Sequence, residues 1–158
     1  MSDAKPVSTP IDKRIKMVNA MSPTSQEEIE EMREIPYQNA VDSLMYASIG
    51  TRPDITHALS RASQFAINPG RQHWIAVKRI LRYLKGTKSL KLMFSKSKFT
   101  TLEVFCDADW ESDEDDYRSY TGYLFISAGA AVSWFSRKQP TFVLSTTEAE
   151  TAKEALWI

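Results

Sequence analysis

Three short strand-like runs constrain the fold of this chain more than any other feature. The first, Thr101–Cys106, alternates as a half-buried strand does. Two further strand-like runs, Gly122–Ser127 and Ala131–Phe135, are joined by the tight connection Ala128-Gly129-Ala130. Antiparallel strands can be joined by a connection this short. We therefore expect a three-stranded antiparallel sheet in the second half of the chain.

Carboxylates stand at two places where a nuclease would need them. Asp107 ends the first strand, and Glu150 follows Ser145-Thr146-Thr147-Glu148, a capping-box pattern that opens a helix. Mg²⁺ takes hard oxygen ligands. Two such ions, roughly 4 Å apart, can clamp the attacking and leaving oxygens of a phosphodiester. The pattern favours a two-metal nuclease built on Asp107 and Glu150.

The segment from Asp107 to Asp116 is an acidic loop with seven carboxylates and no basic residue. It does not fit a calcium-binding loop, because the sixth position is not Gly and Arg118 stands at the twelfth, where Glu is required. Asp109 could assist a metal at Asp107, but a solvated loop is the simpler interpretation.

The first half of the chain is predicted to be helical after an extended leader. Pro6 and Pro10 disfavour a helix in residues 1–21. Residues 22–25 cap a helix that runs through Met32, and a second helix is expected from Tyr37 to Ile49. A third begins at Pro53, is capped by Thr51 and ends near Asn68-Pro69-Gly70.

The fourth predicted helix, Arg71–Lys85, carries both an apolar and a basic face. Its apolar stripe consists of Trp74, Val77, Leu81 and Leu84. From Arg71 to Leu102 there are nine basic residues and no acidic one. Such a patch is typical of nucleic-acid binding, and the candidate residues are Arg71, Lys78, Arg82 and Lys85. A solvated cationic face is the alternative, since no aromatic residue is clearly interleaved on the charged side.

Composition excludes few function classes. The net charge is zero, but residues 1–100 carry 16 basic and 9 acidic residues (+7) and residues 101–158 carry 4 and 11 (−7). The single cysteine, Cys106, allows no internal disulfide and is expected to be a small buried residue. His57 and His73 are isolated, so we expect packing or surface roles and no metal site. No apolar run is long enough for a membrane span, and no signal peptide is visible.

Several motifs now carry a resemblance. Asp107-Ala108-Asp109-Trp110, Tyr120-Thr121-Gly122-Tyr123, Val132-Ser133-Trp134 and Leu144–Glu150 resemble the ribonuclease H domain of copia-type retrotransposon polyproteins. Upstream, Ser43-Leu44-Met45-Tyr46, Thr51–Ile55 and the stretch from His73-Trp74 to Lys85-Gly86-Thr87 resemble the segment that joins reverse transcriptase to ribonuclease H in that family.

The resemblance implies an α+β architecture: an N-terminal helical segment followed by a truncated, ribonuclease H-like three-stranded antiparallel sheet with one helix. The implied domains are a leader (1–21), a connection-like helical segment (22–98) and the truncated domain (99–158). It also makes Asp107 and Glu150 metal ligands. The family's third ligand, an Asp-Asn pair, has no counterpart here, so we expect vestigial carboxylates, no cofactor and no enzyme activity.

One further string points elsewhere. Arg79-Ile80-Leu81-Arg82 matches the RxLR motif of oomycete effectors, although only three of its positions are fixed and it lies in a predicted packed helix. The whole sequence also resembles copia-derived proteins described as secreted RxLR effectors of downy mildews. That resemblance implies secretion into a host plant cell (cytoplasm or nucleus), an unknown host protein partner and suppression of defence-linked cell death. A nucleic-acid-binding or non-functional polyprotein fragment is the alternative.

Overall fold

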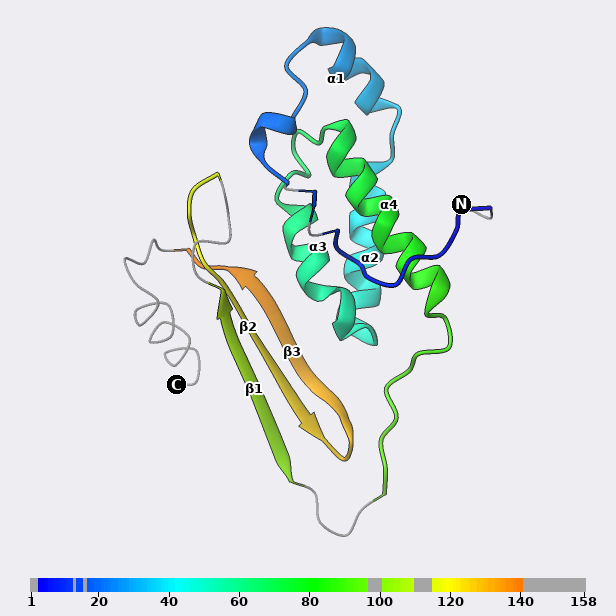
Figure 1. Ribbon diagram of the computed structural model, residues 1–158, viewed down its shortest axis with the longest axis vertical. Coiled ribbons are helices and arrows are strands. Elements are labelled where there is room, and N and C mark those ends of the chain that lie inside the picture. Colours follow the sequence, from blue (N-terminus) through cyan, green and yellow to red (C-terminus); the bar gives the residue numbers. More distant parts are fainter. Residues whose placement is uncertain (1–2, 13, 16, 97–100, 110–114, 141–158) are drawn as a thin grey trace. The chain divides into compact units, whose positions relative to one another are not determined.

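The computed structural model describes residues 3–12, 14–15, 17–96, 101–109 and 115–140. The chain divides into two compact units, Met1–Leu90 and Lys91–Ile158. Within the described residues the first unit is helical and the second contains a three-stranded antiparallel sheet, which confirms the predicted α+β class (Figure 1). The domain bounds implied by the resemblance, with a division between residues 98 and 99, stay a prediction.

The helical unit contains α1 (Gln26–Arg33), α2 (Tyr37–Gly50), α3 (Thr56–Ser63) and α4 (Arg71–Gly86), with 3-10 turns at Asn19–Met21 and Pro53–Ile55. α1, α2 and α4 lie where the sequence predicted them. The third helix is shorter than predicted, because a 3-10 turn without a side-chain cap from Thr51 replaces its first turn and the helix ends at Ser63. Beyond that end, Phe65 stacks on His73 with ring centroids 3.9 Å apart.

α1 begins as the sequence predicted, with a capping box. The Ser25 hydroxyl accepts a hydrogen bond from the Glu28 N–H at 3.2 Å. In return, the Glu28 carboxylate accepts the N–H groups of Thr24 at 3.1 Å and of Ser25 at 3.4 Å. These two backbone bonds lower the pKa of Glu28. Together they satisfy donors that the first helical turn leaves without partners.

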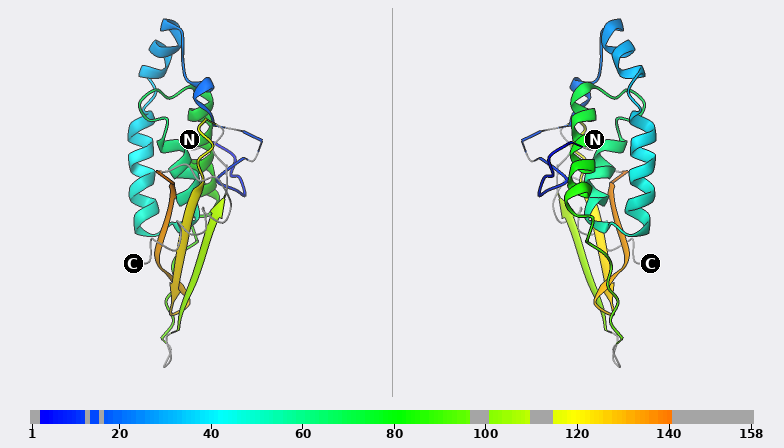
Figure 2. Two further views of the ribbon diagram at one scale, coloured as in Figure 1. Left: turned by 90° about the vertical axis from the view of Figure 1, so that its left-hand side faces the viewer. Right: turned by 90° about the vertical axis from the view of Figure 1, so that its right-hand side faces the viewer.

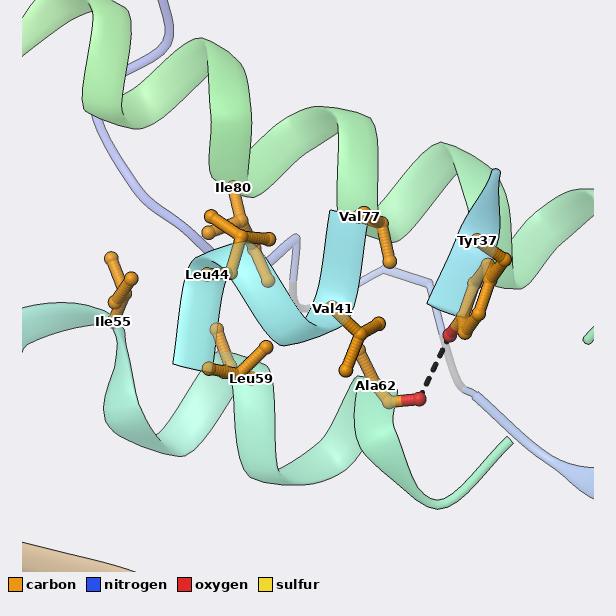
Figure 3. Packing of buried hydrophobic residues seen from close by; sticks show 9 residues of the cluster. Tyr37, Val41, Leu44, Ile55, Leu59, Ala62, Val77 and Ile80 are labelled. Carbon is orange, nitrogen blue, oxygen red and sulfur yellow. Dashed lines mark hydrogen bonds between the residues drawn. The ribbon is translucent and has the colours of Figure 1, made fainter. Parts of the chain in front are cut away.

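The core of the helical unit is formed where α2, α3 and α4 meet (Figure 3). Its fully buried members are Tyr37, Val41, Leu44, Ile55, Ala58, Leu59, Ala62, Val77 and Ile80. The Tyr37 hydroxyl donates a hydrogen bond to the Ala62 carbonyl at 2.8 Å, as Figure 3 shows. Burial raises the pKa of Tyr37, since an ionised phenolate would lose its hydration there.

The apolar stripe of α4 is wider than predicted. Val77 is fully buried, whereas Trp74, Leu81 and Leu84 are only half-buried against the core. The most buried side chains of α4 include Ile80, 1% exposed, and His73, which is fully buried; neither belongs to the predicted stripe. Leu81 packs against the edge of the core, whereas Val77 and Ile80 lie inside it.

The second unit contains β1 (Leu102–Asp109), β2 (Tyr120–Ser127) and β3 (Ala130–Lys138), in the order β1-β2-β3 with antiparallel pairing. Ala128 (φ 53°) and Gly129 (φ 84°) form the tight turn between β2 and β3. Positive φ at both central residues suits the right-handed twist of a hairpin, and Gly adopts it without strain. Cys106 is half-buried opposite Tyr123, so it is less enclosed than expected. The predicted helix after Ser145 lies outside the described residues.

The leader, residues 1–21, is extended where described until its 3-10 turn at Asn19–Met21, as expected. Figures 1 and 2 show it, in dark blue, beside α4, in green. Its last residues approach the start of α4 so closely that a Cβ on Gly70 would lie 1.8 Å from the Met21 carbonyl oxygen. Only glycine fits at that point.

Candidate nucleic-acid interface

Four of the five basic side chains of α4 contact the leader or α1. In sequence, no acidic residue occurs between Arg71 and Leu102, so any carboxylate near this face must come from a distant part of the chain.

Arg79 makes the most extensive contacts with the leader. Its guanidinium donates to the Thr9 carbonyl at 3.1 Å and to the Thr9 hydroxyl at 3.0 Å. A third bond, at 3.1 Å, joins it to the Asp12 carboxylate. The Arg79 side chain is only 22% exposed as a result. Arg79 therefore fixes the middle of the leader on α4.

Arg82 and Lys85 hold the front of the leader. Arg82 donates to the Lys5 carbonyl at 2.6 Å, and Lys85 donates to the Ala4 carbonyl at 2.9 Å. A carbonyl oxygen accepts such a bond but carries no formal charge. Arg82 and Lys85, both predicted to bind nucleic acid, thus donate to carbonyl oxygens of the leader.

The other two predicted residues contact different partners. Arg71 lies 3.6 Å from the Glu31 carboxylate of α1, in a pair whose side chains are both well exposed. Lys78 places its ammonium 5.8 Å from the centre of the Trp74 ring. Exposed ion pairs contribute little to stability. The structure thus places all four residues on α4 but does not bring them onto one continuous open face.

The Asp12 carboxylate accepts hydrogen bonds from two guanidinium groups. Arg14 donates its backbone N–H and two side-chain N–H groups to this carboxylate, each at 3.1 Å, while Arg79 binds from α4. The hydrogen bond from the Arg14 side chain is the largest of the causes that lower the pKa of Asp12 to about 2. Asp12 therefore stays ionised at physiological pH and links the leader to Arg79.

The apolar and the basic residues of Arg79-Ile80-Leu81-Arg82 have different surroundings in the structure. Ile80 packs in the core and Leu81 is half-buried, while both arginines bind the leader. Both arginines lie off the apolar stripe, but their contacts with Thr9 and Lys5 give them a structural role.

His73 lies at the start of α4, and both of its ring nitrogens bind the backbone. Nδ1 accepts the Gly70 N–H at 2.9 Å, so Nε2 carries the proton that faces the Val18 carbonyl at 3.2 Å. This arrangement gives His73 the packing role that the sequence predicted. His57 lies on the exposed side of α3.

A cluster around Arg52 was not singled out from the sequence. Arg52 binds both oxygens of Asp54 at 2.9 and 2.6 Å, and it donates to the Thr87 carbonyl and hydroxyl at 3.3 and 2.6 Å. It also lies over the Tyr83 ring, 5.7 Å from its centre. Two of the motifs that carry the family resemblance, one around Arg52 and the other ending at Thr87, therefore meet in a structural contact.

The proposed nuclease residues are only partly described. Asp107 is exposed on β1 opposite Gly122, and Glu150 lies outside the described residues. Within the described ranges no three His, Cys, Asp or Glu side chains come together as a metal site would require. Of the acidic loop, Asp116 forms an ion pair with Lys138 at 2.8 Å. Burial alone would raise the pKa of Asp116, but the hydrogen bond from Lys138 acts against burial, and the pKa is lowered overall.

Helices in the described part of the chain are all too short or too polar to cross a membrane. No family model matches the sequence, and no solved structure matches the fold. The likeness of the sheet to ribonuclease H therefore stays a prediction.

Comparison with known protein sequences gives several relatives of this chain. Across the whole chain, the sequence is 49% identical to the retrovirus-related Pol polyprotein from transposon TNT 1-94 of Nicotiana tabacum and 40% identical to that from transposon RE1 of Arabidopsis thaliana. The chain spans only 12% and 11% of those polyproteins. It is also 43% identical, over 80% of its length, to secreted RxLR effector protein 161 of Plasmopara viticola, of which it covers 94%. One of these relatives is thus named as an RxLR effector. The identities show that the chain belongs to the family of copia-type, retrovirus-related Pol polyproteins.

Proposed function

We propose that this chain is a non-catalytic, nucleic-acid-binding part of a copia-type Pol polyprotein. The observation that carries the proposal is the run of nine basic residues without an acidic one from Arg71 to Leu102, five of which lie on α4. Arg82 and Lys78 there contact a neutral carbonyl and a neutral ring, which leave their charges available to phosphates. Binding of this kind follows the backbone and is independent of base sequence.

Binding is tested with labelled single-stranded RNA and an RNA–DNA hybrid in a salt series. Affinity should fall by roughly one power of salt concentration per phosphate contact. Lys78→Glu with Arg82→Glu should abolish binding. The matched control is Arg33→Glu with Arg137→Glu, which makes the same change in charge at two exposed positions. Absence of binding at low salt, or an equal loss in the control pair, contradicts the proposal.

The non-catalytic part of the proposal needs a separate assay. Purified protein with Mg²⁺ or Mn²⁺ should leave the RNA strand of a labelled RNA–DNA hybrid intact. Cleavage that disappears in Asp107→Asn would overturn this half of the proposal while leaving the binding half in place.

A second candidate function is that of an RxLR-type effector acting inside plant cells. The observation that favours it is the 43% identity to a protein named as a secreted RxLR effector, whose length this chain covers almost completely. Expressed directly in leaf tissue, the protein should suppress triggered cell death. If the protein accumulates and cell death proceeds unchecked, this candidate is wrong.

A further inference from the structure

We propose that the leader and nucleic acid compete for the same face of α4, so that residues 4–9 must leave before phosphates bind Arg79, Arg82 and Lys85. The inference rests on the nucleic-acid function proposed above and names what regulates it. Its basis is that these three side chains already donate hydrogen bonds to the leader.

The contacts with the leader are of a kind that phosphate replaces. Carbonyl oxygens of Ala4, Lys5 and Thr9 accept bonds from guanidinium and ammonium groups. A phosphate oxygen accepts the same bonds and adds charge attraction, and a guanidinium binds it through two parallel N–H groups. The exchange therefore adds charge attraction to the bonds that leader carbonyls now accept, while Asp12 keeps its own bond to Arg79.

Apolar packing anchors only the rear part of the leader, where Asp12 also pairs with Arg79. Ile11, Ile15 and Met17 line a small space with Ala58 and Ile80, and Met17 is 6% exposed. In contrast, Lys5, Pro6, Ser8 and Thr9 are all exposed, and polar bonds hold this front part. The front can thus lift from α4 while residues 11–17 keep their place in the core.

A disulfide between the leader and the end of α4 tests this directly in the full chain. A Cβ built on Gly86 would lie 2.9 Å from the Pro6 Cβ, so Pro6→Cys with Gly86→Cys can be bridged after a shift of about 1 Å. Cys106→Ser removes the natural cysteine from the background. The oxidised protein has a locked leader and the reduced protein a free one. Pro6→Cys without the second cysteine is the control for oxidation.

The locked form should bind labelled RNA at least about tenfold more weakly than the reduced form. The disulfide prevents the front of the leader from leaving α4, and only the form with the leader lifted binds RNA. Its affinity should also depend less steeply on salt, by about two powers, one each for Arg82 and Lys85, because Asp12 pairs with Arg79 in both forms. Equal binding by both forms overturns the competition but keeps the proposed function. Failure of both forms to bind at low salt overturns the proposed function itself.

A second pair of variants needs no disulfide. Asp12→Asn weakens the carboxylate contact with Arg79, whereas Asp42→Asn makes the same change in charge on the exposed side of α2. Asp12→Asn should raise the affinity for RNA several-fold above Asp42→Asn. Equal affinities in these two variants contradict the competition, whatever the disulfide variant does.

Discussion

Replacing Ile80 with Ala should destabilise the helical unit more than replacing its neighbour Leu81. Ile80 is 1% exposed inside the core, whereas Leu81 is half-buried at its edge. A buried Ile→Ala change removes apolar contacts and leaves a cavity, which costs about 2–5 kcal/mol. Leu81 keeps part of its side chain in water, so its truncation should cost about 1–2 kcal/mol.

The expected free energy of unfolding exceeds either loss over most of its range. At roughly 0.05–0.15 kcal/mol per residue, a domain of about 90 residues has a free energy of unfolding of about 5–13 kcal/mol. Ile80→Ala therefore removes a large fraction of that free energy, and Leu81→Ala removes a small one. Both variants should remain measurable in one denaturation experiment.

Urea denaturation followed by far-ultraviolet circular dichroism provides the measurement, since within the described residues the helices all belong to the first unit. The midpoint should shift to lower urea in the order wild type, Leu81→Ala, Ile80→Ala, with an unchanged slope. A shift for Leu81→Ala as large as that for Ile80→Ala would refute the assignment of the inward face of α4.

Three further outcomes follow from other contacts. Arg52→Ala should cost about 1.5–3 kcal/mol in the same urea experiment, because it strips Asp54 and Thr87 of a charged donor, and Arg52→Lys should not restore the loss. Asp12 has its pKa lowered from 3.8 to about 2, so its contribution to leader docking is complete above pH 4 and lost as pH falls toward 2; carboxyl chemical shifts measured by NMR against pH should show it, and Asp12→Asn should abolish that dependence. Tyr37→Phe should cost about 0.5–1.5 kcal/mol through its lost hydrogen bond, measured by urea midpoint.

Local signals in the sequence were sufficient for most elements. The capping box at Ser25 marks the start of α1. The tight turn at Ala128-Gly129 requires the two flanking strands to pair as an antiparallel hairpin. α4 was predictable because apolar residues recur along it at helical spacing. Its exact inward face was not, since periodicity alone left Ile80 out of the stripe that Leu81 was assigned to.

Contacts between distant residues account for what the sequence did not show. Ala4 and Lys85 are 81 residues apart, and Thr9 and Arg79 are 70 apart. A basic helix face has the same spacing whether it meets water, phosphate or the carbonyls of an extended peptide. The leader has no periodic pattern that would mark it as a partner, and its two prolines indicate only that it is not helical.

The leader contacts change what an RxLR substitution measures. Arg79 and Arg82 stand at the fixed arginine positions of the motif, and both hold the leader in place. A protein expressed directly inside a plant cell needs no delivery. Loss of cell-death suppression in an Arg79→Ala, Arg82→Ala variant would then indicate that the arginines act through leader docking. Activity that persists after direct expression, but is lost when the protein is supplied from outside, would instead identify a delivery signal. The two results assign the same two side chains to different roles, and only the comparison of both routes separates them.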